Sequence, residues 1–173
     1  MILKRIPVGS LMANCYLFGD AATKEVVVID PGDDADKILE AIKTDGLTVK
    51  YIAITHSHFD HVGAIDRVKT EFNVPIASED FTVGSRSITI IKTPGHSPDG
   101  VCLSSGGVVF TGDTLFKGSI GRCDLEGGDF DVLKKSVKKL YSLPDDTAVY
   151  PGHGLSTTIG REKHTNPFVR ANS

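Results

Sequence analysis

Four segments of this chain follow one local pattern, in which a β-type run ends in a turn and a histidine or aspartate follows. The runs are Val49–Thr55, Ile88–Thr93, Val108–Thr111 and Thr147–Tyr150, and they lead to His56, His96, Asp113 and His153. If these strands share one edge of a sheet, the loops at their ends converge, because rigid strands fix the position of their terminal loops. The pattern therefore favours a sheet that carries a polar site along one edge.

The rest of the chain alternates between strand and helix patterns. Further β-type runs are Leu3–Pro7, Asn14–Phe18, Glu25–Asp30 and Val101–Ser104. Apolar residues at helical spacing predict helices within 35–42, 62–72 and 130–141, with caps at Asp33 or Asp34 and at Asp129. Residues 116–129 form a Gly-rich loop in this interpretation, and a polar tail follows the last strand. Such a mixture indicates an α/β layered domain with helices covering a sheet or a pair of sheets.

Length and charge exclude several classes of function. A chain of 173 residues is expected to form one domain over residues 1–173. The net charge of −3 argues against nucleic acid as a partner. No apolar run is long enough for a signal peptide or a membrane span, and the odd number of cysteines favours free thiols. We therefore expect a cytoplasmic protein with no membrane or nucleic-acid partner, as a monomer or a small homo-oligomer.

The segment Thr-His-Ser-His-Phe-Asp-His at residues 55–61 concentrates metal-ligand chemistry. On an extended backbone His56 and His58 point to the same side, and a helix is predicted to start after His61. The segment can thus offer ligands in two directions, which suits two neighbouring ions. Together with the residues that follow the other runs, the candidate metal ligands are His56, His58, Asp60, His61, His96, Asp113 and His153.

These candidates are too many for one tetrahedral ion and suit a pair of divalent ions. No cysteine is among them, so zinc, iron and manganese all fit the set. Zinc is the expected metal, and iron or manganese are alternatives. Asp60 and Asp113 would offset part of the charge of the ions and are the expected catalytic carboxylates. Because a bound metal lowers the pKa of water to about 7, a metal-bridging hydroxide is the expected nucleophile and hydrolysis the expected reaction.

These residues resemble the Thr-His-x-His-x-Asp-His motif of the metallo-β-lactamase superfamily. The resemblance extends over nearly the whole chain and includes Asp30-Pro31-Gly32, Thr93–Ser97, Thr111–Asp113, Tyr150–Gly154 and Asn166–Phe168. It implies a four-layered αββα sandwich with the metals at one edge. It also implies that His56, His58 and His96 hold one ion, that Asp60, His61 and His153 hold the other, and that Asp113 bridges them.

Residues 118–122 and 127–129 resemble the glyoxalase II-like (hydroxyacylglutathione hydrolase-like) branch in particular. This resemblance implies a hydrolase of small thioesters such as S-lactoylglutathione. Two departures from the larger enzymes concern the substrate. The stretch between His61 and His96 is short, and the helical C-terminal domain that helps to bind glutathione is absent from this sequence.

Several alternatives stay open at this stage. A mononuclear iron persulfide dioxygenase would use His56, His96 and Asp113, whereas a lactonase or a nucleic-acid-processing hydrolase is less favoured. Arg122 and Lys117 are candidate substrate-binding residues, although a surface salt bridge explains Arg122 equally well. Asp30 either stabilises its turn or hydrogen-bonds a ligand histidine. Lys134, Lys135, Lys138 and Lys139 are read as the solvated face of their helix, and His164 as a surface residue.

Overall fold

The structure is a computed structural model that describes residues 1–170. Its backbone forms two compact units, one from Met1 to Thr89 and one from Ile90 onward. Each unit contains its own sheet and helices and is described by itself below. The expectation of one domain over residues 1–173 stays a prediction.

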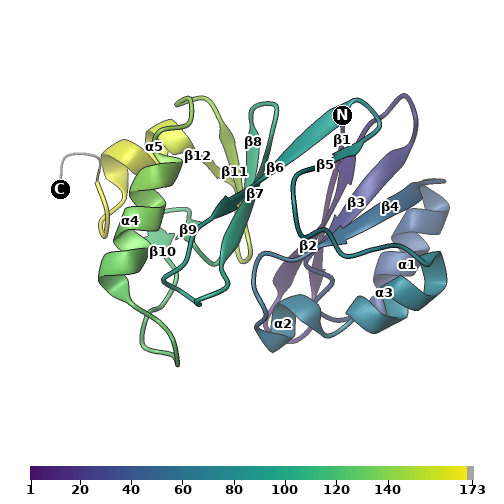
Figure 1. The fold of residues 1–173 in the computed structure, drawn as a ribbon, viewed down its shortest axis with the longest axis horizontal. Helices are drawn as coiled ribbons and strands as arrows, with labels where there is room; N and C mark the ends of the chain where they lie inside the picture. Colours follow the sequence, from purple (N-terminus) through teal and green to yellow (C-terminus); the bar gives the residue numbers. More distant parts are fainter. Residues whose placement is uncertain (171–173) are drawn as a thin grey trace. The chain divides into compact units, whose positions relative to one another are not determined.

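The first unit is built on a sheet with the strand order β1-β2-β3-β4 (Figure 1). Its strands are β1 (Ile2–Val8), β2 (Ala13–Gly19), β3 (Glu25–Ile29) and β4 (Thr48–Ala53). The first two pairings are antiparallel and the β3–β4 pairing is parallel. The β-branched run in β3 is buried from Val26 to Ile29, as a strand covered on both faces should be.

Two helices of this unit bury their apolar stripes against the sheet. In α1 (Ala35–Thr44) the buried residues are Ile38, Leu39 and Ile42, and in α3 (Ile65–Phe72) the buried residue is Val68. They share one core with strand residues such as Val26 and Val28. The predicted cap of α1 is only half right. Asp34 occupies the N-cap position, but it makes no capping bond, since its carboxylate accepts the backbone N–H of Gly9 instead.

The predicted helix between residues 62 and 72 is in fact two helices. A short helix α2 (Phe59–Val62) precedes α3, and the chain turns helical before His61 rather than after it. A hairpin of β5 (Phe81–Val83) and β6 (Arg86–Lys92) completes the unit and runs past its end.

In the second unit the strand order is β12-β11-β8-β7-β6. Its strands are β7 (Val101–Ser105), β8 (Val108–Gly112), β11 (Ala148–Pro151) and β12 (Thr157–Thr158). The predicted β7–β8 hairpin is confirmed, and β8 pairs with β11 in parallel. A second small hairpin, β9 (Leu115–Phe116) and β10 (Ser119–Ile120), lies within the stretch that the sequence marks as loop.

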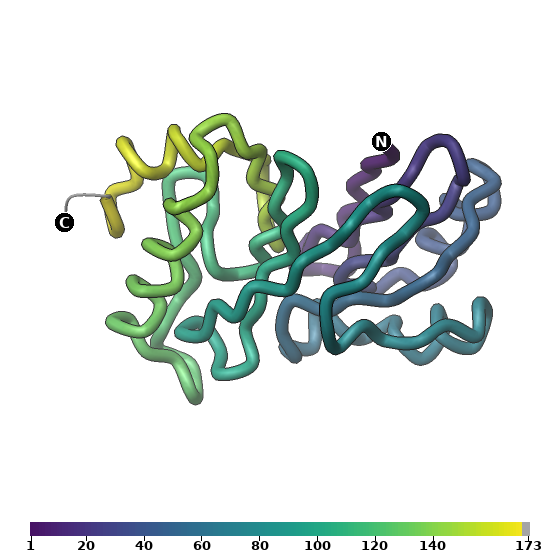
Figure 2. The backbone as a smooth tube through the Cα atoms, turned by 45° about the horizontal axis from the view of Figure 1, so that its top comes forward, coloured from purple at the N-terminus to yellow at the C-terminus, as the bar shows by residue number. Residues whose placement is uncertain are grey.

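The helices of the second unit are α4 (Phe130–Leu140) and α5 (Ile159–Thr165). Asp129 caps α4 as predicted, because its carboxylate accepts the backbone N–H of Val132 at 2.9 Å. Figure 2 follows the backbone from α4 through β11 and β12 into α5. Both helices contribute to one core, through Leu133, Val137 and Leu140 from α4 and Ile159 from α5.

The fold agrees with the predicted α/β class, and each unit is by itself a sheet with helices packed on it. Among the described residues, no helix has both the length and the apolar character that spanning a membrane requires.

Candidate functional site

Four of the candidate ligands lie together in the first unit and are called here the N-terminal cluster: His56, His58, Asp60 and His61. The ring of His56 lies 4.6 Å from that of His58 and 4.2 Å from that of His61, measured between centroids. The strand β4 ends at Ala53, and His58, whose own backbone is extended, is the N-cap of α2. The early helical turn brings the backbone N–H of His61 to the carbonyl of His58 at 2.9 Å.

The carboxylate of Asp30 hydrogen-bonds a candidate ligand histidine of this cluster, which is one of the two roles that the sequence left open. The residue is 1% exposed, although its backbone takes a positive φ of 49°. The carboxylate accepts the N–H and the hydroxyl of Thr55, both at 2.7 Å. It also lies 3.0 Å from Nδ1 of His61. One buried carboxylate therefore fixes both the residue that starts the cluster and the residue that ends it.

These contacts determine the tautomers of two rings. An ionised carboxylate only accepts hydrogen bonds, so Nδ1 of His61 carries the proton that it donates to Asp30. The hydroxyl of Thr55 donates its proton to Asp30. Its oxygen therefore accepts a hydrogen bond from Nδ1 of His56, at 3.1 Å. In both rings Nε2 is the atom with a lone pair, and it is the atom that can bind a metal.

The other three candidate ligands lie together in the second unit and are called here the C-terminal cluster: His96, Asp113 and His153. Parallel pairing of β8 with β11 explains two of them, because it sets Pro151 beside Gly112. Asp113, one residue after Gly112, and His153, two residues after Pro151, therefore leave the same sheet edge, and Oδ2 of Asp113 lies 3.8 Å from Nε2 of His153. His96 follows β6, and its Nε2 lies 3.6 Å from the same oxygen.

His96 is oriented by the backbone rather than by a carboxylate. Its Nδ1 lies 2.8 Å from the carbonyl oxygen of Arg122, which can only accept, so Nδ1 carries the proton and Nε2 faces Asp113. Gly121 allows this approach. A Cβ on Gly121 would lie 1.9 Å from the carbonyl oxygen of Asp113, so any larger residue would displace the loop. No motif in the sequence signals a contact made by a backbone carbonyl.

The spacing of donor atoms tests whether these residues fit a metal. The distances of 3.6 Å and 3.8 Å in the C-terminal cluster have a counterpart of 3.7 Å between Asp60 Oδ2 and His61 Nε2. All three exceed ordinary hydrogen-bond lengths. Two ligands about 2.1 Å from one tetrahedral zinc ion would lie about 3.4 Å apart. Imidazole nitrogens and carboxylate oxygens held at this spacing fit divalent ions.

The candidate substrate residues are on the surface of the second unit. Arg122 makes a bidentate ion pair with Asp124, both bonds being 2.7 Å long, and both side chains are exposed. This pair raises the pKa of Arg122 and lowers that of Asp124 to about 2. Lys117 is also exposed. Burial raises the pKa of the Cys123 thiol, and the neighbouring Asp129 and Asp124 add to this effect, so Cys123 is no thiolate nucleophile at neutral pH.

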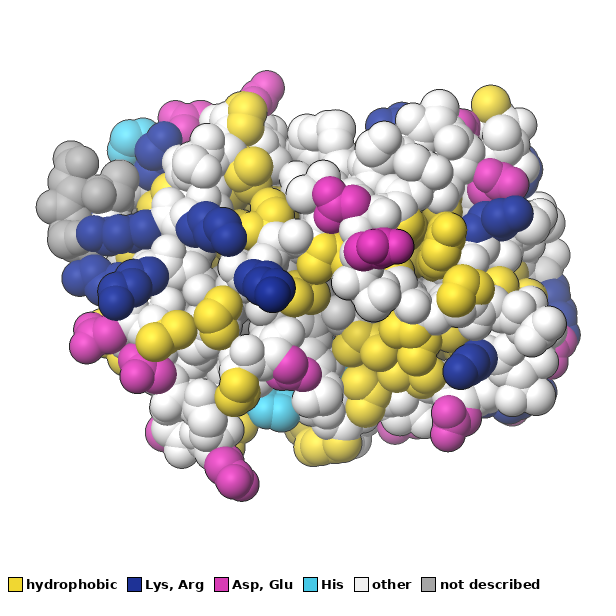
Figure 3. Space-filling model, viewed as in Figure 1, with side chains coloured by type: hydrophobic (Ala, Val, Ile, Leu, Met, Phe, Trp, Pro, Cys, Tyr) yellow, Lys and Arg dark blue, Asp and Glu magenta, His cyan; other side chains and the backbone are white. Residues whose placement is uncertain are grey.

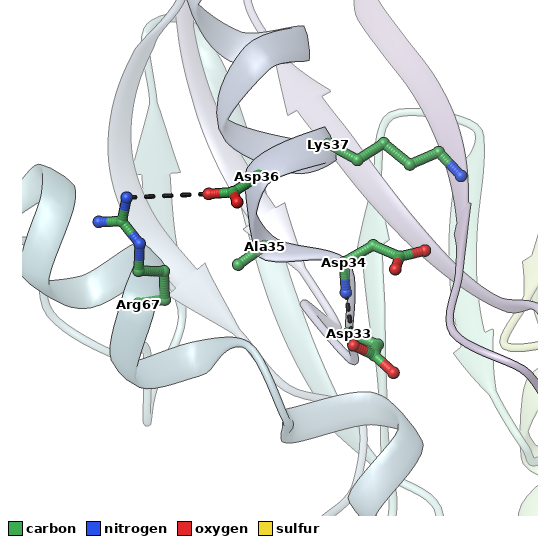
Figure 4. Close-up of a pocket in the computed structure, with 6 residues that line it drawn as sticks. All are labelled: Asp33, Asp34, Ala35, Asp36, Lys37 and Arg67. Atoms are coloured by element: carbon green, nitrogen blue, oxygen red, sulfur yellow. Dashed lines mark hydrogen bonds and ion pairs between the residues drawn. The ribbon is translucent and has the colours of Figure 1, made fainter.

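Other polar groups have structural explanations. Lys and Arg side chains gather over α4 in Figure 3, and the apolar stripe of that helix is buried, so the lysine run is a solvated face as predicted. His164 is 71% exposed. A hollow at the start of α1, shown in Figure 4, is lined by Asp33, Asp34, Ala35, Asp36, Lys37 and Arg67. Its carboxylates shape the helix start, since Asp33 accepts the N–H of Asp34 and Arg67 faces Asp36 at 3.8 Å.

Comparison with curated sequences gives relatives over the full length of the chain. An uncharacterized protein of Aquifex aeolicus is 40% identical, with 98% of this chain and 97% of the relative covered. The hydroxyacylglutathione hydrolase GloC of Haemophilus influenzae is 33% identical, with both chains covered completely.

Solved structures with the same fold include proteins of different stated identity. BLEG-1, a B3 metallo-beta-lactamase, matches with a TM-score of 0.92 and 35% identity over 97% of this chain and 99% of its own. ETHE1 from Myxococcus xanthus matches at 0.91 and 31%, covering 100% of this chain and 86% of its own. TTHA1623, solved in a di-iron-bound form, matches at 0.84 and 36%, covering 96% and 100%. The predicted fold of the metallo-β-lactamase type is thereby confirmed.

The family model of the metallo-beta-lactamase superfamily matches residues 8–83 and 77–153. The two matches overlap at residues 77–83, which lie between His61 and His96. Members of this family are mostly metal-dependent hydrolases. The matches cover both clusters, and the chain belongs to the metallo-beta-lactamase superfamily.

Proposed function

We propose that this chain is a dinuclear metal-dependent hydrolase of small thioesters. In this proposal the N-terminal and C-terminal clusters serve one pair of divalent ions, with Asp113 shared between them as the family resemblance implies. The observation that carries the proposal is the spacing of 3.6–3.8 Å between carboxylate oxygens and Nε2 atoms within each cluster. A mononuclear enzyme would not require that spacing around both Asp60 and His153.

A bound pair of divalent ions would supply water of lowered pKa and an electrophile for a carbonyl oxygen. The residues of the chain prepare this chemistry. Asp60 and Asp113 offset part of the positive charge and are the proposed catalytic carboxylates. Hydrogen bonds to Nδ1 of His56, His61 and His96 hold each ring with Nε2 toward the ligand cluster, so that no ring has to reorient when metal binds.

A thioester suits this site because thiolate is a good leaving group. No acid is needed to protonate it, and the motifs offer no further acid. The likeness to GloC, which is named as a hydroxyacylglutathione hydrolase, supports an acylated thiol such as S-lactoylglutathione as the substrate. Arg122 and Lys117 stay the proposed contacts for an anionic group of that substrate.

The proposal also includes the remaining predictions for the whole chain. Zinc is the proposed metal, and the di-iron form of TTHA1623 supports iron as the alternative. We propose a single domain over residues 1–173, a monomer or small homo-oligomer, a cytoplasmic location, and a small molecule as partner.

The second candidate is a mononuclear iron persulfide dioxygenase that uses His56, His96 and Asp113. The likeness to ETHE1 from Myxococcus xanthus, whose stated identity differs from that of GloC, keeps this candidate beside the first. The way in which the other candidate ligands are held argues against this second candidate. His61 is buried at 0% exposure and oriented by Asp30, an arrangement that a single iron on the other three residues would leave without use.

The test is a substrate panel with metal analysis on purified protein. The panel contains S-lactoylglutathione, another acyl thioester, a lactone, a β-lactam and glutathione persulfide. We expect hydrolysis of a thioester by the wild type and its loss in Asp60→Ala and in His153→Ala. Asp33→Ala is the matched control, because Asp33 lies outside both clusters. Intact thioester hydrolysis in Asp60→Ala and His153→Ala would refute the dinuclear proposal, and sulfite production from the persulfide would favour the second candidate.

A further inference from the structure

A buried carboxylate outside the two clusters makes an unusual number of contacts. Glu162 of α5 is 0% exposed. One of its oxygens accepts the hydroxyl of Thr157 at 2.6 Å, and the other accepts the backbone N–H of Gly118 at 2.8 Å and the amide of Asn166 at 3.0 Å. Burying a carboxylate is costly unless its lone pairs are filled, and here they are filled by donors from three parts of the chain.

Two of these contacts lead to the β9–β10 hairpin. Glu162 binds Gly118 at the tip of that hairpin, where φ is +71°. Asn166, also 0% exposed, donates from the same amide nitrogen to the carbonyl of Ser119 at 3.0 Å. Glu162 and Asn166 therefore hold the hairpin tip to α5 through both a backbone donor and a backbone acceptor.

Both ends of that hairpin meet the C-terminal cluster. It begins directly after the Asp113 turn, where the hydroxyl of Thr111 donates to the carbonyl of Leu115 at 2.8 Å. It is followed by Gly121, which lies close to the backbone of Asp113, and by Arg122, whose carbonyl accepts from Nδ1 of His96. A shift of the hairpin tip would thus be transmitted to the group that sets the orientation of His96.

We propose that Glu162, with Asn166, is a positioning residue for His96, acting through the β9–β10 hairpin and the carbonyl of Arg122. In this role Glu162 contacts neither a cluster residue nor substrate. It fixes the loop that keeps Nε2 of His96 directed at Asp113. The relevance of this role to catalysis rests on the proposed function, whereas the positioning itself is a property of the second unit.

Hydrogen bonding should matter here more than charge, because the ion pair of Glu162 with Arg161 is 3.7 Å long and the Arg161 side chain is 57% exposed. In Glu162→Gln the amide oxygen can accept from Gly118 and Asn166, while the amide nitrogen can donate to Thr157, whose hydroxyl also accepts. The conservative variant should therefore keep the hairpin in place. Glu162→Ala leaves Gly118 and Asn166 without this acceptor and should release the tip. Asn166→Ala removes the bonds to the carbonyl of Ser119 and to Glu162, and should act in the same direction to a smaller extent. It also removes the oxygen that accepts the backbone N–H groups of Phe168 and Val169.

Tyr141→Phe is the matched control for stability. The hydroxyl of Tyr141 donates to the backbone carbonyls of Glu162 and Val169, at 3.1 and 2.8 Å, and so ties α5 and the following residues to α4 through hydrogen bonds that do not involve the hairpin. This variant should lower Tm by removing buried hydrogen bonds. It should leave His96 unaffected.

The experiment compares the four variants with the wild type as full-length, Zn²⁺-loaded protein, using two readouts. Nitrogen-15 NMR of labelled histidines follows the Nδ1 proton of His96, assigned with His96→Ala, and chelator competition measures Zn²⁺ affinity. We expect Glu162→Ala to lose that proton signal through exchange with water and to bind Zn²⁺ about tenfold more weakly. Glu162→Gln should restore both readouts, and Tyr141→Phe should change only Tm.

An unchanged His96 signal in Glu162→Ala and Asn166→Ala would overturn the proposal, as would equal effects in Tyr141→Phe. If Glu162→Ala fails to fold, Asn166→Ala against Glu162→Gln decides it by the same signal. The proposed function fails separately: a wild type that hydrolyses no thioester, while its His96 signal still depends on Glu162, would contradict the function and leave the positioning role in place.

Discussion

The candidate ligands of the first unit all lie within residues 56–61, whereas those of the second unit are drawn from positions 96, 113 and 153. Local backbone geometry arranges the N-terminal cluster, through an extended segment that turns into α2. Strand pairing arranges the C-terminal cluster, because Asp113 and His153 meet only where β8 and β11 run in parallel.

The supports of the two clusters differ in the same way. In the N-terminal cluster a single side chain, Asp30, orients His61 and Thr55. In the C-terminal cluster a backbone carbonyl, that of Arg122, orients His96, and its position depends on a hairpin. The first cluster should therefore be sensitive to one point mutation of its support, and the second to changes in chain conformation.

The largest effect is expected at Asp113, which lies close to both His96 and His153 in the C-terminal cluster. Asp113→Ala should lower kcat/KM for a thioester roughly a thousandfold, since bound metal contributes several kcal/mol to transition-state stabilisation. Steady-state kinetics together with metal content per chain measure this effect. If Asp113→Ala kept both its ions and its activity, the role assigned to the cluster would be wrong.

A smaller loss is expected when the support of the N-terminal cluster is changed. Asp30→Asn keeps an acceptor for Thr55 but places an amide N–H against Nδ1 of His61, which then turns or changes tautomer. Metal affinity should fall about 10- to 100-fold. Chelator competition measures it, and Asp33→Asn, a neighbouring exposed carboxylate, is the control. Equal metal affinities in Asp30→Asn and Asp33→Asn would contradict the role of Asp30 as the support of the N-terminal cluster.

A change of conformation should affect the C-terminal cluster without removing any ligand. Gly121→Ala places a Cβ where 1.9 Å separates it from the carbonyl oxygen of Asp113, so the loop must move and activity should fall. Gly107→Ala is the control, because Gly107 has a φ of +85° and open space around it. It should lose only about 1–2 kcal/mol of stability, for the left-handed backbone, and keep full activity. Thermal unfolding and kinetics on both variants separate the two effects.

The smallest effect concerns the exposed Arg122–Asp124 pair. The pKa of Asp124 is lowered to about 2, so its contribution to stability is complete above the unfolded value of about 3.8 and lost as pH falls through about 2. Tm of the wild type and Asp124→Asn should therefore converge near pH 2. At neutral pH, Asp124→Asn should release Arg122 and lower KM for an anionic thioester but not for a neutral one. An identical KM change for both would exclude Arg122 from substrate binding.

Sequence reasoning was most successful where the signal is local. The strand Glu25–Ile29, the stripe of α4 and the Asp129 cap follow from residues close together in the chain. The α2 start was missed by three residues, because the bond from His61 to the carbonyl of His58 is a backbone contact with no side-chain signature. Whether the seven candidates bind metal is still a prediction.

Contacts between distant residues were harder to predict. The helix α5 has seven residues and its buried positions include a glutamate, Glu162, so it shows no apolar stripe. The β9–β10 hairpin has strands of two residues each, too short for an alternating pattern. Asp30 was recognised as an option because a carboxylate can be read from the sequence, whereas the carbonyl of Arg122 cannot.

The most direct test of the central claim is the number of metal ions per chain in the active protein. Protein reconstituted with Zn²⁺, freed of excess metal and then analysed by mass spectrometry of the metal should contain two ions per chain and hydrolyse a thioester. Asp60→Ala and His153→Ala should each contain fewer ions and hydrolyse less. A fully active wild type with a single ion per chain would contradict the account.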